Sequence, residues 1–411
     1  MSSARKNQIR RCACWLLPLA AGLLLPLAGC TVIRTITAPS AQAQGASEDT
    51  EVVILADASP SASAPASTTA PLTALAGETE TSELEGEPSP TPLNGGVSPT
   101  TGRLLPDGAV YRPVLVVIDN AALARPQTAL MMADIVYEFP LDRDDHSTRY
   151  LALFSDELPD RVGPVRTSRT YLAQTAREWG GLYVSLGDPE QADDGYPSLA
   201  ESGLRYRAEN AGAAEAYFYR DKTVSSAEEH TLFFQLLPYV ENNDFTADFS
   251  QTRFAFEEGV VYEKGKVFQS VGVPFTSSDN ERVVFTYDKL RNVLVRSDKN
   301  SKKVLGASTS LTPTDDALGY ANEPITVQNL IVQYVRVSAY DSTFRSISLT
   351  GKGDCLYFVN GRVVFGSWSR ASLDEPTSYA LYDGTIVRLE PGNTWIMMMP
   401  STREVKIRYG G

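Results

Sequence analysis

The chain has 411 residues, of which 50 are acidic and 37 are basic, so its formal net charge is −13 at pH 7. This acidic balance argues against a nucleic-acid partner and against electrostatic attachment to an anionic membrane. With four cysteines and two histidines, the chain has no cysteine-rich metal pattern, and we expect neither a metal nor another cofactor.

Residues 1–29 have the pattern of a lipoprotein signal peptide. A basic start is followed by an apolar stretch from Trp15 to Leu27, then by Ala28-Gly29-Cys30. The stretch is shorter than the roughly twenty residues that span a bilayer as a helix. We therefore predict that Cys30 becomes a diacylglyceryl cysteine and anchors the protein to the extracytoplasmic side of the cell membrane. Cleavage would remove four basic and no acidic residues, changing the net charge from −13 to −17.

Residues 30–107 are rich in Ala, Ser, Thr and Pro, with one apolar run at 52–55. Such a composition buries too little apolar surface to offset the entropy of ordering, so it predicts a lipid-anchored disordered linker. The apolar run could dock on a neighbouring surface, or it could be a chance cluster.

An α/β domain is predicted over 108–255. Strands are expected at 114–118, 134–139, 148–154 and 182–186. Apolar residues at helical spacing predict a helix over 169–179, after the Gly163-Pro164 turn, with Ser168 as its N-cap. This alternation of strand and helix is typical of α/β domains.

A mostly antiparallel β-rich domain is predicted over 278–411, which makes the overall class α+β. Strands are expected at 283–287, 325–335, 346–349, 355–365, 381–389, 395–399 and 405–409. Asn360-Gly361 and Asp383-Gly384 are typical hairpin turns. We expect Trp368 and Trp395 in the core, and we expect Cys355 to be a buried, unreactive thiol.

A basic neighbourhood in the first domain is the best candidate for a ligand site. Guanidinium groups near the start of a helix can hold phosphate or carboxylate. The candidate anion-binding residues are Arg125, Arg149, Arg166, Thr167, Ser168, Arg169 and His230. The alternative is that these arginines form structural ion pairs with Asp134, Glu138, Asp156 and Asp160. His230 fits a buried hydrogen-bonding role as well as a site role.

Short catalytic motifs are missing from the sequence. It has no Gly-x-Ser-x-Gly elbow, no phosphate-binding glycine loop and no His-Glu-x-x-His. Catalytic residues therefore stay unknown, and the sequence favours a protein that is not an enzyme.

Several segments resemble the YerB-like lipoproteins, which are bacterial envelope proteins with two domains of unknown function. In the first domain the resemblance rests on 113–120, Ala124-Arg125-Pro126-Gln127, 133–138, 148–154, Gly163-Pro164-Val165-Arg166, 217–221 and His230. In the second it rests on 329–333, Gly351-Lys352-Gly353, Asn360-Gly361 and 391–396. The resemblance implies a two-domain, membrane-anchored protein.

Together these features predict a binding or scaffold module that takes an anionic envelope ligand or a protein partner related to the cell wall. The alternative is an enzyme that acts on a phosphate-containing cell-wall or lipid-linked substrate. In that case Asp119 or Asp134 would serve as acid, base or metal ligand, and the arginines would neutralise charge in the transition state.

Overall fold

The computed structural model describes residues 50–53, 96–141, 148–187, 199, 202–208, 216–225, 227–247, 254–275, 282–298, 324–339 and 345–410. The predicted signal peptide, Cys30 and most of the predicted linker lie outside these described residues. None of the described helices is long and apolar enough to cross a membrane.

The N-terminal half is built on a mixed sheet with the order β3-β4-β2-β5-β6. Its strands are β2 (Val114–Asp119), β3 (Ile135–Pro140), β4 (Thr148–Phe154), β5 (Leu182–Ser185) and β6 (Arg205–Ala208). β2, β3 and β4 are buried at every position, as expected for strands covered on both faces. β4 is antiparallel to both β2 and β3, whereas β5 is parallel to β2 and to β6.

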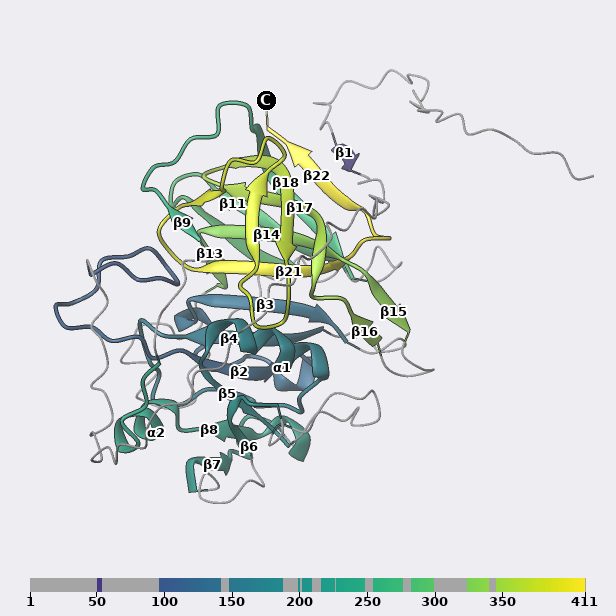
Figure 1. The fold of residues 1–411 in the computed structure, drawn as a ribbon. Helices are drawn as coiled ribbons and strands as arrows, with labels where there is room; N and C mark the ends of the chain where they lie inside the picture. The colour runs from purple at the N-terminus through teal and green to yellow at the C-terminus, as the bar shows by residue number, and fades with distance from the viewer. Residues whose placement is uncertain are drawn as a thin grey trace, which may run out of the picture. The chain divides into compact units, whose positions relative to one another are not determined.

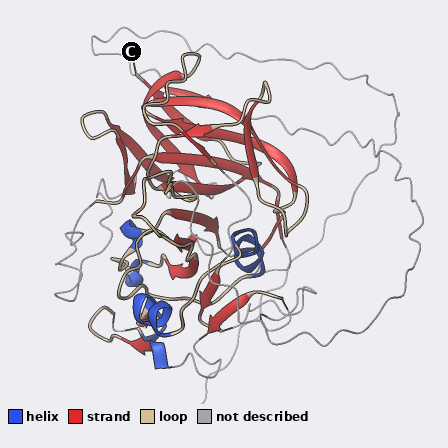
Figure 2. Cartoon of the chain, turned by 60° about the vertical axis from the view of Figure 1, so that its left-hand side comes forward, coloured by secondary structure: helices blue, strands red, loops and turns tan. Residues whose placement is uncertain are grey.

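Short helices and a small hairpin surround this sheet (Figure 2). They are η1 (Ala122–Ala124), η2 (Leu130–Met132), α1 (Thr170–Ala176), η3 (Arg177–Trp179), β7 (Phe218–Arg220), η6 (Glu228–His230), β8 (Leu232–Phe234) and α2 (Leu236–Asn242). The helix predicted over 169–179 is present as α1 and η3. The prediction of Ser168 as its N-cap is wrong, because Arg169 holds that position and no side chain caps the helix. The Ser168 hydroxyl instead lies 2.5 Å from the Tyr183 hydroxyl.

The C-terminal half consists of strands and loops (Figure 2). They are β9 (Ala255–Phe256), β10 (Lys266–Pro274), β11 (Arg282–Asp288), β12 (Val293–Asp298), β13 (Thr326–Val327), β14 (Asn329–Val335), β15 (Val337–Ala339), β16 (Arg345–Ile347), β17 (Gly351–Val359), β18 (Arg362–Arg370), β19 (Ser378–Leu381), β20 (Arg388–Leu389), β21 (Thr394–Pro400) and β22 (Val405–Tyr409). The predicted hairpin at Asn360-Gly361 is confirmed: it joins β17 to β18, and φ is 47° at Asn360 and 72° at Gly361.

One sheet runs through both halves, because β21 lies between β14 and β3 and is parallel to both (Figure 1). All seven residues of β21 are buried, which suits a strand covered on both faces. The second half is therefore mostly antiparallel, with a parallel strand where it meets the first half. β10 falls between the two predicted domains and pairs with β11, β18 and β22.

The last part of the predicted linker belongs to the folded body. Ser98, Thr100 and Thr101 are at most 1% exposed. Their hydroxyl groups donate hydrogen bonds to Asp134 and Asp156, at the start of β3 and just after β4. Ordered structure thus begins before residue 108, because these hydroxyl groups satisfy the buried carboxylate of Asp134 and the half-buried carboxylate of Asp156.

The described residues are mostly strand, with few helices. The predicted α+β class is therefore supported only in a coarser form, as a strand-dominated fold with short helices. The predicted core positions are confirmed, since Cys355, Trp368 and Trp395 are at most 3% exposed. Burial raises the pKa of the Cys355 thiol well above its ordinary value, which agrees with an unreactive thiol.

Candidate anion-binding site

Asp119 is the centre of the candidate site. It is the last residue of β2 and is 4% exposed. Its Oδ2 atom lies 2.7 Å from Nδ1 of His230 and 3.2 Å from Nε of Arg166, while Oδ1 accepts a hydrogen bond from the Ala121 N–H. One carboxylate therefore orients a histidine and an arginine that are far from it in sequence.

A short segment between β2 and β8 places these partners. The Asp119 N–H donates to the Pro164 carbonyl oxygen, and the Val165 N–H donates to the Leu232 carbonyl oxygen. Gly163 makes the close approach to β8 possible, since its φ is 158° and a Cβ there would lie 2.8 Å from the Leu232 oxygen. The turn thus brings both Arg166 and the β8 region, which follows His230, next to Asp119.

Arg149 stands opposite Asp119 in the pairing of β4 with β2. It is 4% exposed, and its Nη1 donates to the Thr167 carbonyl oxygen at 2.7 Å. Among the described residues, its buried Nε has no hydrogen-bond partner. Burial and the neighbouring charge of Arg169 lower the pKa of Arg149 to about 10. Arg149 is therefore a buried cation whose charge is not fully compensated.

Arg169 is another buried arginine of this cluster. It is 3% exposed, and its Nη1 donates to the Ser168 carbonyl oxygen at 3.0 Å. Arg125 lies at the margin, where its Nε donates to Oδ1 of Asn120 at 3.0 Å. Three elements of the fold therefore supply guanidinium groups around the end of β2.

A chain of buried hydrogen bonds links Asn120, next to Asp119, to the C-terminal half of the protein. Asn120 donates to the Thr148 hydroxyl at 2.7 Å, and that hydroxyl donates to Oε1 of Glu138 at 2.7 Å. Glu138 is fully buried and also accepts from Nη2 of Arg296 at 2.8 Å and from the Trp395 indole at 3.0 Å. The site thus rests on a charge pair between β3 and β12.

The structure brings most of the predicted site residues together. Arg166 and His230 contact Asp119, and Arg149 stands opposite Asp119 with Arg169 near it. Thr167 contributes its carbonyl group, and Ser168 points to Tyr183 instead. In the alternative interpretation the arginines form structural ion pairs with four acidic residues, and three of these have different partners in the structure. Glu138 pairs with Arg296, whereas Asp134 and Asp156 accept hydrogen bonds from the 98–101 segment.

Arg296 is the residue that sequence reasoning missed, because β12 was not among the predicted strands. The pattern of residues around Arg296 could have indicated its role. Leu294 and Arg296 are both at most 1% exposed, and they occupy alternate positions of a strand that begins with three apolar residues. A charged residue at an inward position of such a strand requires a buried partner, and Glu138 is that partner.

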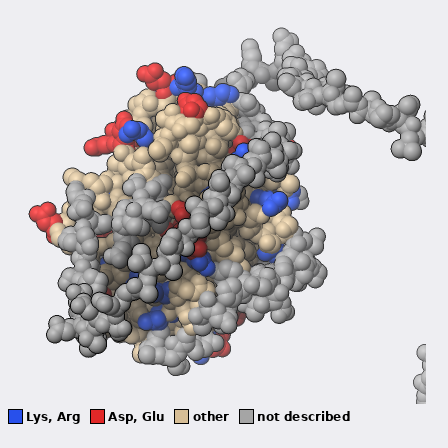
Figure 3. Space-filling view, viewed as in Figure 1, with Lys and Arg blue, Asp and Glu red and all other residues tan. Residues whose placement is uncertain are grey.

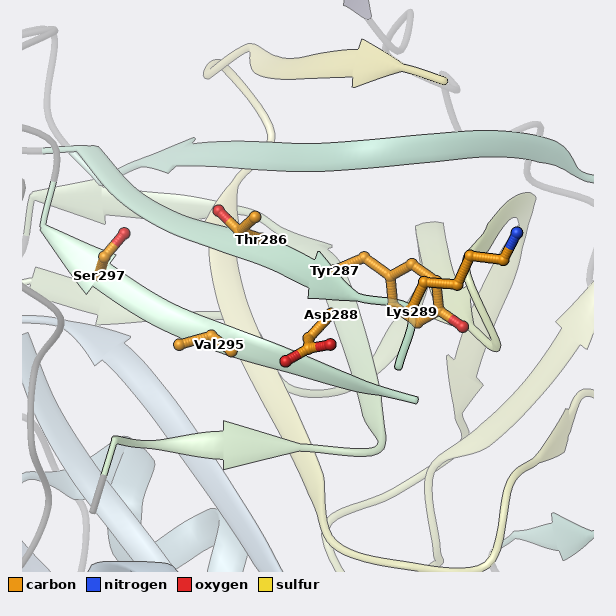
Figure 4. A pocket seen from close by; sticks show the side chains of 6 residues that line it. All are labelled: Thr286, Tyr287, Asp288, Lys289, Val295 and Ser297. Atoms are coloured by element: carbon orange, nitrogen blue, oxygen red, sulfur yellow. The ribbon is translucent and has the colours of Figure 1, made fainter. Parts of the chain in front are cut away.

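Basic side chains reach the surface in the lower part of the face drawn in Figure 3, over elements of the N-terminal half. An open groove of about 500 Å³ lies elsewhere, on the hairpin of β11 and β12 (Figure 4). It is lined by Thr286, Tyr287, Asp288, Lys289, Val295 and Ser297, and none of these is a predicted site residue. This groove is therefore separate from the candidate site.

Comparison with known proteins shows a family and a relative to which this chain is similar. Residues 100–253 match the N-terminal domain, and residues 271–396 the C-terminal domain, of a family described as protein of unknown function DUF3048. The YerB protein of Bacillus subtilis (strain 168), whose name classes it provisionally as a lipoprotein, is 26% identical over 302 residues, which are 73% of this chain and 84% of YerB. The crystal structure of YerB has a TM-score of 0.59 at 24% identity and covers 74% of this chain and 96% of its own.

Proposed function

The chain belongs to the DUF3048 family, with both family domains present, and from that premise we propose that it is a lipid-anchored envelope protein that binds an anionic ligand at the Asp119 cluster. The ligand class is a phosphate or carboxylate group of an envelope molecule. An acidic segment of a protein related to the cell wall would use the same arginines. Binding, rather than catalysis, is the primary role.

The observation that carries the ligand proposal is the state of Arg149. This guanidinium group is nearly fully buried, its Nε has no partner among the described residues, and burial and Arg169 lower its pKa, so holding it charged costs free energy in the absence of a ligand. An anion would supply both the missing acceptor and the missing negative charge. Charge-assisted hydrogen bonds to arginine are about twice as strong as neutral ones.

Membrane anchoring is supported by the sequence Leu27-Ala28-Gly29-Cys30 and by the name of the relative in Bacillus subtilis. A thiol directly after small residues and an apolar leader is where lipid would be attached. Since the protein carries a strong net negative charge, attraction to anionic lipids would not hold it at a membrane. The lipid is therefore the proposed anchor, and the extracytoplasmic side is the proposed location.

The ligand proposal is tested by calorimetric titration with inorganic phosphate, pyrophosphate and acetate at low salt. Arg166 is the residue to change, because its side chain is 25% exposed and its replacement leaves the core intact. We expect Arg166→Gln to weaken phosphate binding about tenfold, the loss of one charge-assisted contact.

Arg177→Gln is the matched control, since Arg177 has the same residue type and a side-chain exposure of 27% but pairs with Asp374. Its affinity for phosphate should equal that of the parent. If the parent binds none of the three anions, or if both variants bind phosphate equally well, the anion site is refuted.

An enzyme that acts on a phosphate-containing cell-wall or lipid-linked substrate is the second candidate, and the Asp119–His230 pair favours it. A carboxylate on Nδ1 fixes the imidazole tautomer and leaves Nε2 to exchange protons; here Nε2 lies 3.9 Å from Glu229. This candidate predicts release of inorganic phosphate from pyrophosphate or a phosphomonoester, with a divalent metal present, and loss of that activity in His230→Gln. Absence of turnover in the parent with Mg²⁺, Mn²⁺ and Zn²⁺ would exclude it.

A further inference from the structure

β22 is a sheet strand with a partner on each edge, and one of the partners comes from the predicted linker. On one edge β22 pairs with β10. On the other it pairs antiparallel with β1 (Thr50–Val53), with Thr50 opposite Arg408 and Val53 opposite Val405. Figure 1 shows β1 beside β22, near the C-terminus. A segment with a linker-like composition around it therefore extends the sheet of the folded body.

β22 is held in place for this pairing by the burial of alternate side chains. Val405 and Ile407 are fully buried, whereas Lys406 and Arg408 alternate with them and are half-buried. Among the described strands, β1 covers the edge of β22 that β10 leaves open. An open edge exposes unpaired N–H and C=O groups, and an extended segment that supplies matching groups removes this cost.

The β-branched pair Val52-Val53 gives the occupant a sequence suited to an extended strand. The occupant belongs to the same chain, so its local concentration is high and pairing needs no second molecule. This pair begins the run 52–55, which is the apolar cluster within the composition of 30–107.

We propose that the open edge of β22 is the docking site of the chain's own segment Thr50–Val53, and that this docking sets how far the folded body reaches from its lipid. The proposal rests on the proposed anchor at Cys30. Twenty residue steps separate Cys30 from Thr50, and 66 separate Cys30 from Gly96, where the described body resumes. At about 3.5 Å per step, the longest possible reach is about 70 Å with β1 docked and about 230 Å with β1 released.

The consequence concerns which ligands the Asp119 cluster can meet. A docked β1 keeps the body within about 70 Å of the membrane, which restricts it to anionic groups on lipids or on molecules close to the membrane surface. When β1 is released, the Asp119 cluster can reach anionic groups much farther from the membrane. The pairing of β1 with β22 therefore acts as a length control on the tether.

Disulfide trapping in the membrane-bound, full-length protein tests the docking. Val52 and Lys406 are opposed in the register, so Val52→Cys/Lys406→Cys should form a disulfide in most molecules under mild oxidation. Val53→Cys/Lys406→Cys is the matched control, because neighbouring residues of a strand point to opposite faces. The proposal is overturned if the two pairs cross-link equally or if neither does.

Hydrogen exchange of the peptide 405–409 provides a second readout that needs no added thiol. Val52→Pro removes a backbone donor and the extended pairing, so we expect the β22 amides that face β1 to exchange at least tenfold faster. Ser63→Pro, outside β1, should leave their exchange unchanged. Equal exchange in the parent and in Val52→Pro would refute the docking.

The anchor and the docking can fail separately. In Cys30→Ser the lipid is absent, yet the Val52→Cys/Lys406→Cys disulfide should still form, because the pairing involves backbone and sheet register alone. Loss of the cross-link in a protein that still takes up labelled palmitate would refute the docking. A cross-link in a protein that takes up none would refute the anchor at Cys30.

Discussion

Replacing Arg149 with methionine is predicted to stabilise the free protein while it abolishes phosphate binding. Burial and Arg169 lower the pKa of Arg149 from 12.5 to about 10. At about 1.4 kcal/mol per pKa unit, holding this guanidinium charged costs on the order of 3 kcal/mol. Methionine fills the space of the side-chain stem and gives up the hydrogen bond to Thr167, worth about 1 to 1.5 kcal/mol. The expected net gain is about 1 to 2 kcal/mol at pH 7.5.

The pH dependence follows from the direction of the shift. The unfolded chain holds the Arg149 proton more tightly than the folded chain, so this group disfavours folding wherever it is charged in both states. That cost is constant below pH 10 and is relieved as the pH rises through about 10. The stability gap between Arg149→Met and the parent should therefore be flat from pH 6 to 9 and narrow above pH 10.

Urea unfolding across this pH range, with and without phosphate, measures both effects. Arg370→Met is the matched control, because Arg370 is 2% exposed and donates to the carbonyl oxygens of Glu375, Leu373 and Gln174. Arg370→Met should lose about 2 to 4 kcal/mol, since it leaves buried acceptors unpaired. If Arg149→Met is destabilised as much as Arg370→Met, Arg149 is an ordinary structural arginine and the reasoning fails.

Three further changes probe what supports the site. Gly163→Ala should cost about 2 kcal/mol or more in urea unfolding and weaken phosphate binding, because the new Cβ would meet the Leu232 carbonyl oxygen at 2.8 Å. Glu138→Gln should cost about 3 to 5 kcal/mol in the same assay, since it leaves Arg296 buried without its carboxylate partner. Asp134→Asn should be more stable than the parent at pH 7, because burial raises the pKa of Asp134, and the gap should close below about pH 4.

Each of these has its own control. Gly187→Ala places a Cβ in open space at a φ of 70° and should cost only about 1 kcal/mol. The double variant Glu138→Gln/Arg296→Met should recover part of the loss, and an additive double loss would show that the two residues do not act as a pair. Asp160→Asn, at a half-buried position, should leave the stability at pH 7 close to that of the parent.

Element positions in the first half could be predicted where apolar runs are continuous. The strand expected at 148–154 is β4 with the same limits, and 114–118 lies within β2. The strand expected over 325–335 is instead broken into β13 and β14, because the Gln328 N–H donates to the Asn393 carbonyl oxygen outside the ladder. Ser168 failed as an N-cap because its hydroxyl has a nearby tertiary partner in Tyr183, which no local pattern encodes.

The basic composition of the candidate site was visible in the sequence, but its centre was not. Arginines stand out in an acidic chain, whereas Asp119 looked like one of several carboxylates. Its partner His230 lies 111 residues away, and the Trp395 indole reaches Glu138 across 257 residues. Such partners are chosen by how strands pair, and local periodicity carries no record of that choice.

The sequence by itself determined the short-range features of this protein. These are its buried strands, the Asn360-Gly361 turn, the apolar leader that ends at Cys30 and the concentration of arginines, because each depends on residues within a few positions of one another. Tertiary structure alone decided that β21 joins the two halves, that Asp119 collects Arg166 and His230, and that β1 lies on β22. The physical reason is that burying a sheet edge or a charge requires a partner, and the chain finds that partner only when it folds.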